Sequence, residues 1–536
     1  MSAFNEEYRF GSAGWSIEPD LRQAGLFDKT GPQIGYWNDK LLNLEGDAPM
    51  ITIGGAGSGK CRDLLSYVVC NSPGLRMLTL DPRGELASIS AHVHAIHGEY
   101  AWHWNPLHLC NLPGNSCNPL DILKLDSPNF HADCKFIVEG LIPLSTNGDG
   151  KYFELRARDW LENLIKSIVE QFGRISLPAL YRVINVIEAN PERWADQLEA
   201  MLKSRFEGVR RTAGEMLTKQ QDSGKEFGAI LGEIYAYLSF LDDPALLASL
   251  EESDFSLQGL CNPTRACKIF LNIPAEYLSI WSPLVRLFFT VTMLYKSRVP
   301  ESPRVMLLVD EAGQLGRFEA LLRAFTYGRG AGVRAWAIFQ DAGQITRNYG
   351  SAALQGFLGS AQMRQFFGVR DFETAQLISN MLGQETLEYD DTLQQQAAQR
   401  QKRDTIRQVL GGADPFEAAY DFTHFKRNEE HRTKQARPLM TPSEILALPE
   451  DRQILFISGK NLKPILAAKY PYYTRREMAG KYLPNPYHPP LDSVLIKGRF
   501  GKKTAKIITE AVPQKMATFP QHASGCLSYV KGYKSF

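Results

Sequence analysis

A glycine-rich segment directly after a short apolar run restricts the fold of this chain more than any other feature. In ITIGGAGSGKCRD, Gly54 is followed by four residues, Gly59 and Lys60, at the point where a helix would begin. Glycines let backbone N–H groups wrap a phosphate without Cβ clashes, and the helix N-terminus adds partial positive charge. The pattern predicts a strand, a phosphate-binding loop (P-loop) and a helix, as in α/β nucleotide-binding folds. A glycine-rich turn that only packs is the alternative.

This loop supplies the candidate nucleotide-binding residues, among which the lysine would reach the β- and γ-phosphates. They are Gly54, Gly55, Ala56, Gly57, Ser58, Gly59, Lys60 and Cys61. Cys61 stands where serine or threonine is usual, and a neutral thiol is a poor ligand for Mg²⁺, which prefers oxygen. We therefore expect Cys61 to hold no metal. Either Mg²⁺ rests on phosphate oxygens, water and Asp310, or its binding is weakened, so nucleotide binding should survive while turnover depends on which alternative holds.

A second element far downstream supports a nucleotide site. In VMLLVDEAGQ an apolar run ends in the adjacent carboxylates Asp310 and Glu311. A buried strand of this kind places Asp310 at its carboxyl end, where ligands bind in open α/β sheets. We expect Asp310 to hold Mg²⁺ through water and Glu311 to orient the attacking water. Two charges that simply end a buried strand are the alternative.

Two further polar residues follow the acidic pair. Gln340 ends the apolar run AIFQ, where an amide can sense the γ-phosphate; an ordinary glutamine at a strand end explains it equally well. Arg329 lies in YGRGAG, after the helix that follows the pair. A guanidinium there can complete a neighbouring subunit's site by stabilising transition-state charge. A surface arginine in a glycine-rich turn is the alternative.

Composition bounds the class of protein. The chain has 536 residues, 44% of them hydrophobic, which suffices for a large core and for more than one folding unit. Its net charge is +1, so any contact with nucleic acid must come from a local patch or a multimeric channel. The eight cysteines include no CxxC pair, which favours reduced thiols in a cytosolic setting. No run of about eighteen apolar residues and no signal peptide is present, which predicts a soluble chain.

Short apolar runs bounded by Gly and Pro predict a mostly parallel sheet covered on both faces. The expected strands lie within 48–55, 76–81, 100–107, 268–274, 304–311, 334–340, 363–369 and 452–458. Residues 131–250 differ, because apolar residues such as Trp160, Leu161 and Leu164 fall at helical spacing there. We therefore expect an all-α insertion within an α/β domain.

These differences in apolar spacing and in charge divide the chain into predicted parts. A small strand-rich lead-in precedes the nucleotide-binding domain, whose two pieces flank the helical insertion; a polar linker or exposed helix, a C-terminal part of the same domain and a basic, flexible tail follow. The boundaries are 1–47, 48–130 with 251–387, 131–250, 388–437, 438–490 and 491–536. For the tail, contact with DNA phosphates or an anionic membrane competes with a merely solvated end.

Further segments, taken in chain order, extend the pattern beyond the nucleotide site. They are LDPRGEL (80–86), WNPL (104–107), CNPLDIL (117–123), VDEAGQLG (309–316), GRGAG, FQDAGQI, FFGVRDFETAQLISNMLGQET (366–386) and RPLMTPSEILALPEDRQILF (437–456). With GGAGSGK as Walker A and VDEAGQLG as Walker B, the ordered set resembles the type IV secretion coupling ATPases of bacterial conjugation, the TraG/TraD-like family. Arg83 replaces a lysine of the family's Asp-Pro-Lys-Gly-Glu segment. The resemblance covers residues from about 11 to 485.

The resemblance implies a RecA-like P-loop NTPase with a mostly parallel sheet and an inserted all-α domain, a region often tied to substrate recognition. It further implies a homo-hexameric ring that uses ATP and Mg²⁺ and passes DNA or protein to a secretion channel at the inner membrane. Lys60, Asp310, Glu311, Gln340 and Arg329 would take the roles given above.

Two departures from the family's pattern bear on these expectations. Many members carry N-terminal transmembrane helices and this chain has none, so we expect a protein of the bacterial cytoplasm, held peripherally at the inner membrane by a partner. The residue after the P-loop lysine is Ser, Thr or Gly in the family, which favours a working site despite Cys61.

Two functions fit these observations. The first is an ATP-dependent coupling protein that recruits and translocates DNA, single-stranded and carried with a relaxase, or another nucleoprotein substrate, to the secretion channel. The second is a nucleotide-binding recruitment platform for secreted proteins with little ATP turnover, which Cys61 and the missing membrane anchor keep open. A small-molecule kinase or GTPase fits poorly, because such enzymes are compact and here a long insertion separates Lys60 from Asp310.

A weaker signal is a histidine-rich segment between residues 92 and 131. Six of the ten histidines lie there, close to Cys110 and Cys117. Their spacing fits no tetrahedral zinc pattern well, so loop packing is preferred over a metal site.

Overall fold

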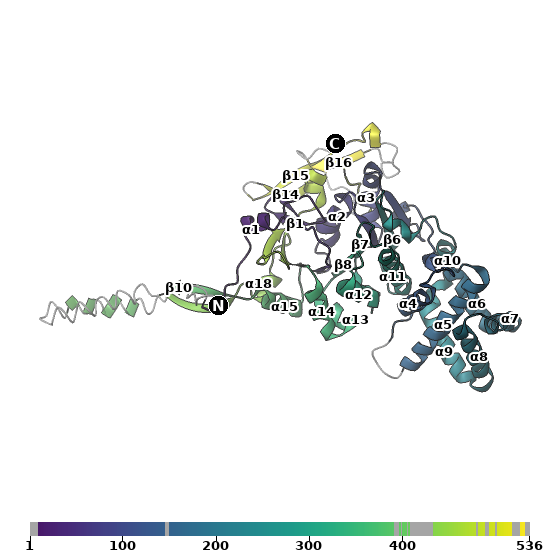
Figure 1. Ribbon diagram of the computed structural model, residues 1–536. Helices are drawn as coiled ribbons and strands as arrows, with labels where there is room; N and C mark the ends of the chain where they lie inside the picture. The colour runs from purple at the N-terminus through teal and green to yellow at the C-terminus, as the bar shows by residue number, and fades with distance from the viewer. Residues whose placement is uncertain are drawn as a thin grey trace.

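One large sheet organises the protein, as the computed structural model in Figure 1 shows. The structure describes residues 9–144, 150–390, 432–478, 481–487, 493–498, 501–516 and 526–530, with separate helical residues between 396 and 407. The strands of the large sheet are β1 (Gln33–Trp37), β2 (Lys40–Asn43), β3 (Met50–Gly54), β4 (Arg76–Pro82), β5 (Tyr100–Trp104), β6 (Cys267–Ile273), β7 (Val305–Val309), β8 (Val333–Phe339), β9 (Met363–Phe367), β12 (Arg452–Ile457) and β13 (Ile465–Ala468).

Parallel strands make up most of this sheet. The order is β2-β1-β13-β12-β9-β3-β8-β7-β4-β6-β5, and the seven strands from β9 to β5 run parallel. The remaining four continue the sheet by antiparallel pairing. Every residue of β7 and β8 is buried, as expected of strands covered on both faces. All eight expected strands are confirmed, and the strand-rich lead-in at 1–47 contributes β1 and β2 to the same sheet.

Helices cover both faces of the sheet. Alternate side chains of β3 enter different cores, because Ile51 and Ile53 belong to one hydrophobic cluster and Met50 to the other. The face of Met50 is covered by η2 (Lys60–Leu65), α2 (Ser66–Cys70) and α3 (Glu85–Ile96). The opposite face is covered by α11 (Ser282–Arg298), α12 (Glu319–Tyr327), α13 (Ala342–Tyr349), α14 (Ser351–Ser360) and α15 (Phe372–Leu382). Two short helices, α1 (Glu18–Gln23) and α18 (Pro442–Leu446), complete this part.

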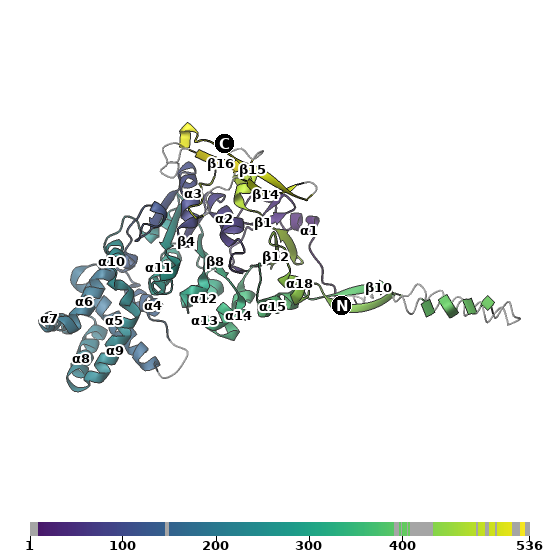
Figure 2. The same cartoon turned by 180° about the vertical axis from the view of Figure 1, so that it is seen from behind.

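A group of helices is inserted between β5 and β6. Its members are α4 (Phe130–Leu141), α5 (Lys151–Phe172), α6 (Leu177–Ala189), α7 (Pro191–Leu202), α8 (Glu207–Asp222), α9 (Gly224–Leu238) and α10 (Pro244–Glu251). Figures 1 and 2 show α5 to α9 projecting from one side of the sheet, the side where Figure 1 labels β6. The described residues from 105 to 266 contain no strand, so the expected all-α insertion is confirmed. Where the chain is described, no helix combines the length and the apolar character needed to cross a bilayer.

The region 388–437, predicted as a polar linker or an exposed helix, has helical, exposed residues where it is described between 396 and 407, but it also contains strand at its ends. Its two ends belong to an antiparallel ribbon of β10 (Gln384–Asp390) and β11 (Arg432–Pro438), while the described residues between 396 and 407 are helical and exposed. Glu385 faces Arg437 across the ribbon, with 3.8 Å between their charged groups. Pairing of opposite charges across the ribbon favours strands, and it cannot be inferred from the composition of the segment.

The tail at 491–536, predicted to be basic and flexible, contains strands among its described residues. They form a small antiparallel sheet of β14 (Ser493–Gly498), β15 (Gly501–Ala511) and β16 (Cys526–Val530). Residues with strand preference, such as Thr504 and Ile508, alternate with or follow the lysines of β15. The excess of lysine concealed this pattern in the sequence.

Candidate nucleotide site

The P-loop joins β3 to η2 at the carboxyl end of the parallel strands. Gly57 and Gly59 have φ values of +69° and +85°, in the left-handed region that favours glycine. A Cβ atom added to Gly59 would lie 2.3 Å from Asp63 Oδ2, so a side chain has no room there. The sequence therefore needs these glycines to turn directly from strand into helix, with Lys60 as the first helical residue.

Lys60 and Glu311 meet although they stand far apart in the sequence. Lys60 Nζ donates a hydrogen bond to the Gly54 carbonyl oxygen at 3.0 Å and lies 3.6 Å from Glu311 Oε1. Their strands, β3 and β7, are separated in the sheet by β8. The carboxyl ends of these strands thus bring the loop lysine and the acidic pair to one place, as expected of an open α/β sheet.

Three polar residues form the other wall of this place. Glu311 follows β7 with φ +52°, a backbone conformation that non-glycine residues seldom adopt. Its N–H donates to Asp310 Oδ1 at 2.9 Å, and its Oε2 accepts from Gln340 Nε2 at 2.8 Å. Burial first, and then the charge of Glu311, raises the pKa of the Asp310 carboxyl. The structure therefore gathers Lys60, Asp310, Glu311 and Gln340 into one cluster.

Cys61 lies beside this cluster but is not suited to metal binding. It is half-buried and packs against the second hydrophobic cluster, which includes Tyr470 and Tyr472. Burial raises the pKa of the Cys61 thiol well above its ordinary value, and nearby carboxylates act in the same direction. The thiol therefore stays protonated, and a neutral thiol is a weak ligand for a hard cation.

Arg329 is the predicted residue that the structure does not bring to the cluster. It follows α12 and precedes β8, so it lies at the amino end of the parallel strands. Its Nε donates to Asp47 Oδ2 at 2.9 Å, and its side chain is 69% exposed. Asp47 precedes β3 whereas Lys60 follows it. Arg329 and Lys60 therefore lie at opposite ends of the parallel strands.

With this geometry in place, the comparison with protein families is decisive. A model of the family described as "Type IV secretory system Conjugative DNA transfer" matches residues 6–490. The chain belongs to this family. Membership confirms the resemblance seen in the ordered motifs and makes the chain a type IV coupling protein of the conjugative DNA-transfer class.

Individual relatives of this conjugative DNA-transfer protein are distant but extensive. Protein VirD4 of Rhizobium rhizogenes is 24% identical over 490 residues, which cover 89% of this chain and 67% of that protein. Conjugal transfer protein TraG of Escherichia coli is 22% identical over 526 residues, covering 87% and 77%. The chain thus spans about two thirds of the length of the VirD4 relatives.

Solved structures confirm the RecA-like P-loop fold. Plasmid coupling protein TrwB, in complex with the non-hydrolysable ATP analogue ADPNP, matches with a TM-score of 0.59 at 17% identity, covering 87% of this chain and 96% of that chain. TrwB in complex with ADP and Mg²⁺ matches with a TM-score of 0.58 at 16% identity, covering 86% and 96%.

The residues of the cluster fit a nucleotide with Mg²⁺. The loop leaves no room for side chains at Gly55 and Gly59, because a Cβ atom on Gly55 would also lie 2.2 Å from the Gly368 carbonyl oxygen. Lys60 supplies a cation at the end of the loop, and Asp310 and Glu311 supply carboxylate oxygens, which Mg²⁺ prefers. Lys60 holds a carbonyl and Glu311 in this structure, and a phosphate group is a stronger partner for its ammonium group.

Sequence reasoning missed a buried lysine that contacts the P-loop backbone. Lys469, directly after β13, donates from Nζ to the Ser58 carbonyl oxygen at 2.7 Å and to Asp63 Oδ2 at 2.9 Å. The side chains of Lys469 and Asp63 are each 2% exposed. Arg62 also donates to both oxygens of Asp63. A single lysine in AAKYPYY follows no recognisable pattern, so no sequence signal could have found it.

The segment around Arg83 borders the site. Asp81 accepts from the N–H groups of Leu86 at 3.2 Å and Ala87 at 2.8 Å, and so caps the start of α3. Burial raises the pKa of the Asp81 carboxyl to about 7. The Arg83 carbonyl oxygen accepts from the Tyr487 hydroxyl at 2.8 Å, which ties this chain's Asp-Pro-Arg-Gly-Glu segment to the described residues 481–487.

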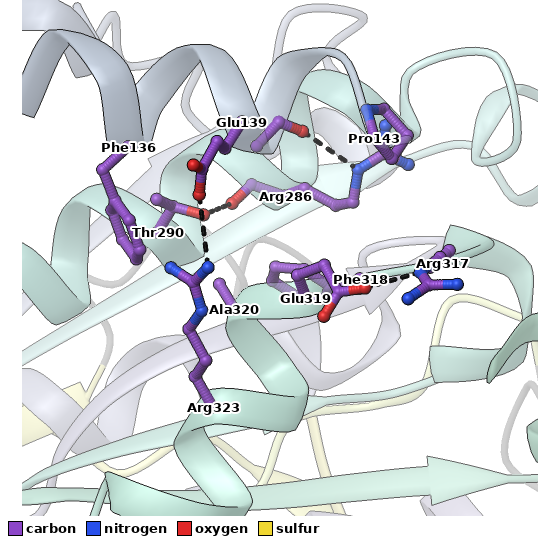
Figure 3. A pocket seen from close by; sticks show the side chains of 11 residues that line it. Phe136, Glu139, Pro143, Arg286, Thr290, Arg317, Phe318, Glu319, Ala320 and Arg323 are labelled. Atoms are coloured by element: carbon purple, nitrogen blue, oxygen red, sulfur yellow. Dashed lines mark hydrogen bonds and ion pairs between the residues drawn. The ribbon is translucent and has the colours of Figure 1, made fainter. Parts of the chain in front are cut away.

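A pocket elsewhere in the molecule is not part of this site. Figure 3 shows it between α4, α11 and α12, where Arg323 pairs with Glu139 at 3.2 Å. Arg286 donates to the carbonyl oxygens of Leu315 at 2.9 Å and Gly140 at 3.3 Å, and burial lowers its pKa to about 10. No predicted nucleotide residue lines the pocket. Among the described residues, those of the histidine-rich segment included, no group of three or more His, Cys, Asp or Glu is placed to hold a metal ion.

Proposed function

We propose that the protein is an ATP-dependent motor that moves DNA to a type IV secretion channel. The observation that carries this proposal is the meeting of Lys60 with Glu311, 3.6 Å apart, while Gln340 holds the other Glu311 oxygen at 2.8 Å. A cation on a P-loop and a carboxylate fixed by an amide are the groups that phosphoryl transfer to water requires. The names of the relatives, conjugal transfer and coupling proteins, support the cargo and the destination.

Each residue of the cluster has one task in this mechanism. The P-loop N–H groups and Lys60 would bind the phosphates, and Asp310 would hold Mg²⁺. When bound there, Mg²⁺ would supply positive charge against the charge that develops on the phosphates. Glu311 orients the attacking water, and Gln340 keeps the Glu311 carboxylate in place and senses the γ-phosphate. This arrangement supports hydrolysis between subunits, with each site closed by a neighbour.

The assembly follows from Arg329. Arg329 lies at the end of the parallel strands opposite Lys60 and is largely exposed. It can therefore complete a site in an adjacent subunit but not its own. Head-to-tail contacts of this kind close into a ring. We propose a homo-hexamer in the bacterial cytoplasm, peripheral at the inner membrane, that receives single-stranded DNA with its relaxase and delivers it to channel components.

Turnover measurements test the motor. We expect the wild type to hydrolyse ATP faster when single-stranded DNA is present. Glu311→Gln should bind nucleotide normally but lose turnover by at least about a hundredfold, since it removes the group that orients water. Glu301→Gln is a matched control, because Glu301 is exposed near the amino end of β7. Nucleotide binding without turnover in the wild type would contradict the motor.

A second candidate function is a recruitment platform for secreted proteins with little turnover. It is favoured by Cys61, whose protonated thiol offers Mg²⁺ no good ligand. Cys61→Ser discriminates between the two functions. If the motor is correct, this change leaves the rate within about twofold; a large increase in rate would show that the thiol holds the natural protein in a binding role.

A further inference from the structure

Arg370 lies beside the P-loop and takes no part in the cluster described above. It follows β9, the strand that flanks β3 on the side away from β8. We propose that the Arg370 guanidinium binds the α- and β-phosphates of the nucleotide in the P-loop of its own chain. This inference rests on the proposed function, since it requires a nucleotide in that loop.

Close backbone contact fixes the start of the Arg370 side chain against the P-loop. A Cβ atom added to Gly368 would lie 2.3 Å from Ser58 Cβ, and one added to Gly55 would lie 2.2 Å from the Gly368 carbonyl oxygen. Gly368 has φ +57°, which favours glycine. The two loops thus pack without room for a side chain between them, so the position of Arg370 is tied to that of the P-loop.

The Arg370 side chain runs along the outside of the P-loop. The Cβ position on Gly55 is 3.7 Å from Arg370 Cγ, and the Cβ position on Gly57 is 3.9 Å from Arg370 Nη2. Gly57 is in the middle of the segment whose N–H groups cradle phosphates in P-loops. The guanidinium therefore ends next to the cradle, within reach of a bound phosphate by a change of rotamer.

The guanidinium of Arg370 is available for a ligand. It is exposed and makes no hydrogen bond or ion pair with any residue that the structure describes. The other arginines discussed differ, because Arg62 is held by Asp63 and Arg329 by Asp47. Even the adjacent Asp371 is engaged, since its Oδ1 accepts from the Thr374 N–H at 2.7 Å. A free guanidinium beside an anion cradle is well suited to phosphate, which it can bind through two donors.

The position of Arg370 in the sheet decides which phosphates it meets. Glu311 and Gln340 follow β7 and β8, on one side of β3, and the γ-phosphate must lie there to meet the attacking water. Arg370 follows β9, on the other side of β3. The part of the nucleotide that extends away from the γ-phosphate, namely the α- and β-phosphates, is thus the part that reaches Arg370.

Calorimetric titration of the full-length chain with ADP and with ADPNP, both with Mg²⁺, tests this assignment. Arg370→Ala should lower the affinity for both ligands by a similar factor of about ten or more. The reason is that the variant loses a charge-assisted hydrogen bond to the α- and β-phosphates, which both ligands contain. Arg370→Lys should recover part of the affinity, since it keeps the charge but loses the paired donors. Arg174→Ala is the matched control, an exposed arginine in the helical insertion, and should bind as the wild type does.

Each result decides the proposal. The melting temperature without nucleotide should be unchanged in both Arg370 variants, because the side chain bonds nothing that the structure describes. Unchanged affinity of Arg370→Ala for both ligands would overturn the proposal while leaving the proposed function intact. Weakened binding of ADPNP alone would overturn the assignment to the α- and β-phosphates. A wild type that binds neither ligand would remove the proposed function together with this inference.

Discussion

The Lys469 ammonium group lies 2.9 Å from Asp63 Oδ2 and 2.7 Å from the Ser58 carbonyl oxygen, beneath the P-loop. Both side chains are almost fully buried, at 2% exposure each. A buried ion pair that also holds loop backbone fixes the loop as well as the fold. Residues from the end of the domain therefore determine the shape of the nucleotide cradle near its beginning.

Removing this lysine should cost both stability and nucleotide affinity. In Lys469→Met, Asp63 keeps Arg62 but loses its buried partner, and breaking a buried pair destabilises a protein by about 3 kcal/mol or more. We expect a lower melting temperature and weaker binding of ADPNP, measured by calorimetry. Lys463→Met, at a neighbouring exposed lysine, is the control. A variant with wild-type melting temperature and affinity would show that Lys469 does not support the loop.

Acid should destabilise the fold through two buried histidines. Burial lowers the pKa values of His94 and His103 to about 4, from an ordinary value of 6.5. Both are therefore neutral in the folded chain, while the unfolded chain binds protons below pH 6.5. As the pH drops from 6.5 toward 4, each histidine should therefore add a loss of about 1.4 kcal/mol per pH unit to the slope of the free energy of unfolding against pH. The Asp81 carboxyl, whose pKa burial raises to about 7, acts in the opposite direction over this range, so the histidine contribution is measured by removing one histidine.

Denaturant unfolding at pH 7.0, 5.5 and 4.5 measures this slope. His103→Phe should reduce it, because a phenylalanine keeps an aromatic ring near Phe270, on which His103 stacks at 5.4 Å between centroids, but cannot bind a proton. Equal slopes in the wild type and the variant would contradict the assignment to His103. Burial alone would raise the pKa of Glu99, but hydrogen bonds and charge from His94 and Lys268 lower it to about 2. Protonation of Glu99 therefore adds a further loss of stability below pH 4.5.

The parts of the site that sequence could predict are those encoded locally. The P-loop, Asp310, Glu311 and Gln340 each end an apolar strand, and parallel strands must place their carboxyl ends at one edge. Lys469 and Arg370 could not be found this way, because their positions depend on β13 and β9 lying near the P-loop. The ribbon of β10 and β11 was missed for a similar reason, since its strands are stabilised across the ribbon and not along the chain.

The hydrogen bond from Gln340 to Glu311 should matter for turnover more than for binding. Gln340→Leu removes the donor that holds Glu311 Oε2 at 2.8 Å, so the carboxylate loses the orientation that an attacking water needs. We expect kcat to fall by roughly tenfold to a hundredfold with little change in ADPNP affinity. Gln376→Leu is the control, at a half-buried glutamine of α15 whose amide donates to Asn380 Oδ1 at 2.9 Å, far from the cluster in sequence and on another element. A weakened affinity at unchanged kcat would place Gln340 in binding instead.

The location of Arg329 predicts complementation between two inactive variants. Lys60→Ala should abolish ADPNP binding, whereas Arg329→Ala should still bind ADPNP but lose turnover by about a thousandfold, the usual effect of removing an arginine from a phosphoryl-transfer site. Because Arg329 lies at the end of the parallel strands opposite Lys60, an intact Lys60 from one variant can meet an intact Arg329 from the other across a subunit contact. In a random mixed ring about a quarter of the contacts have this arrangement, so ATPase activity should reappear on mixing. Arg304→Ala, at the second arginine near Asp47, should remain active alone. If mixing restores no activity although the two variants assemble together, Arg329 does not act on a neighbour, and its pairing with Asp47 is its role.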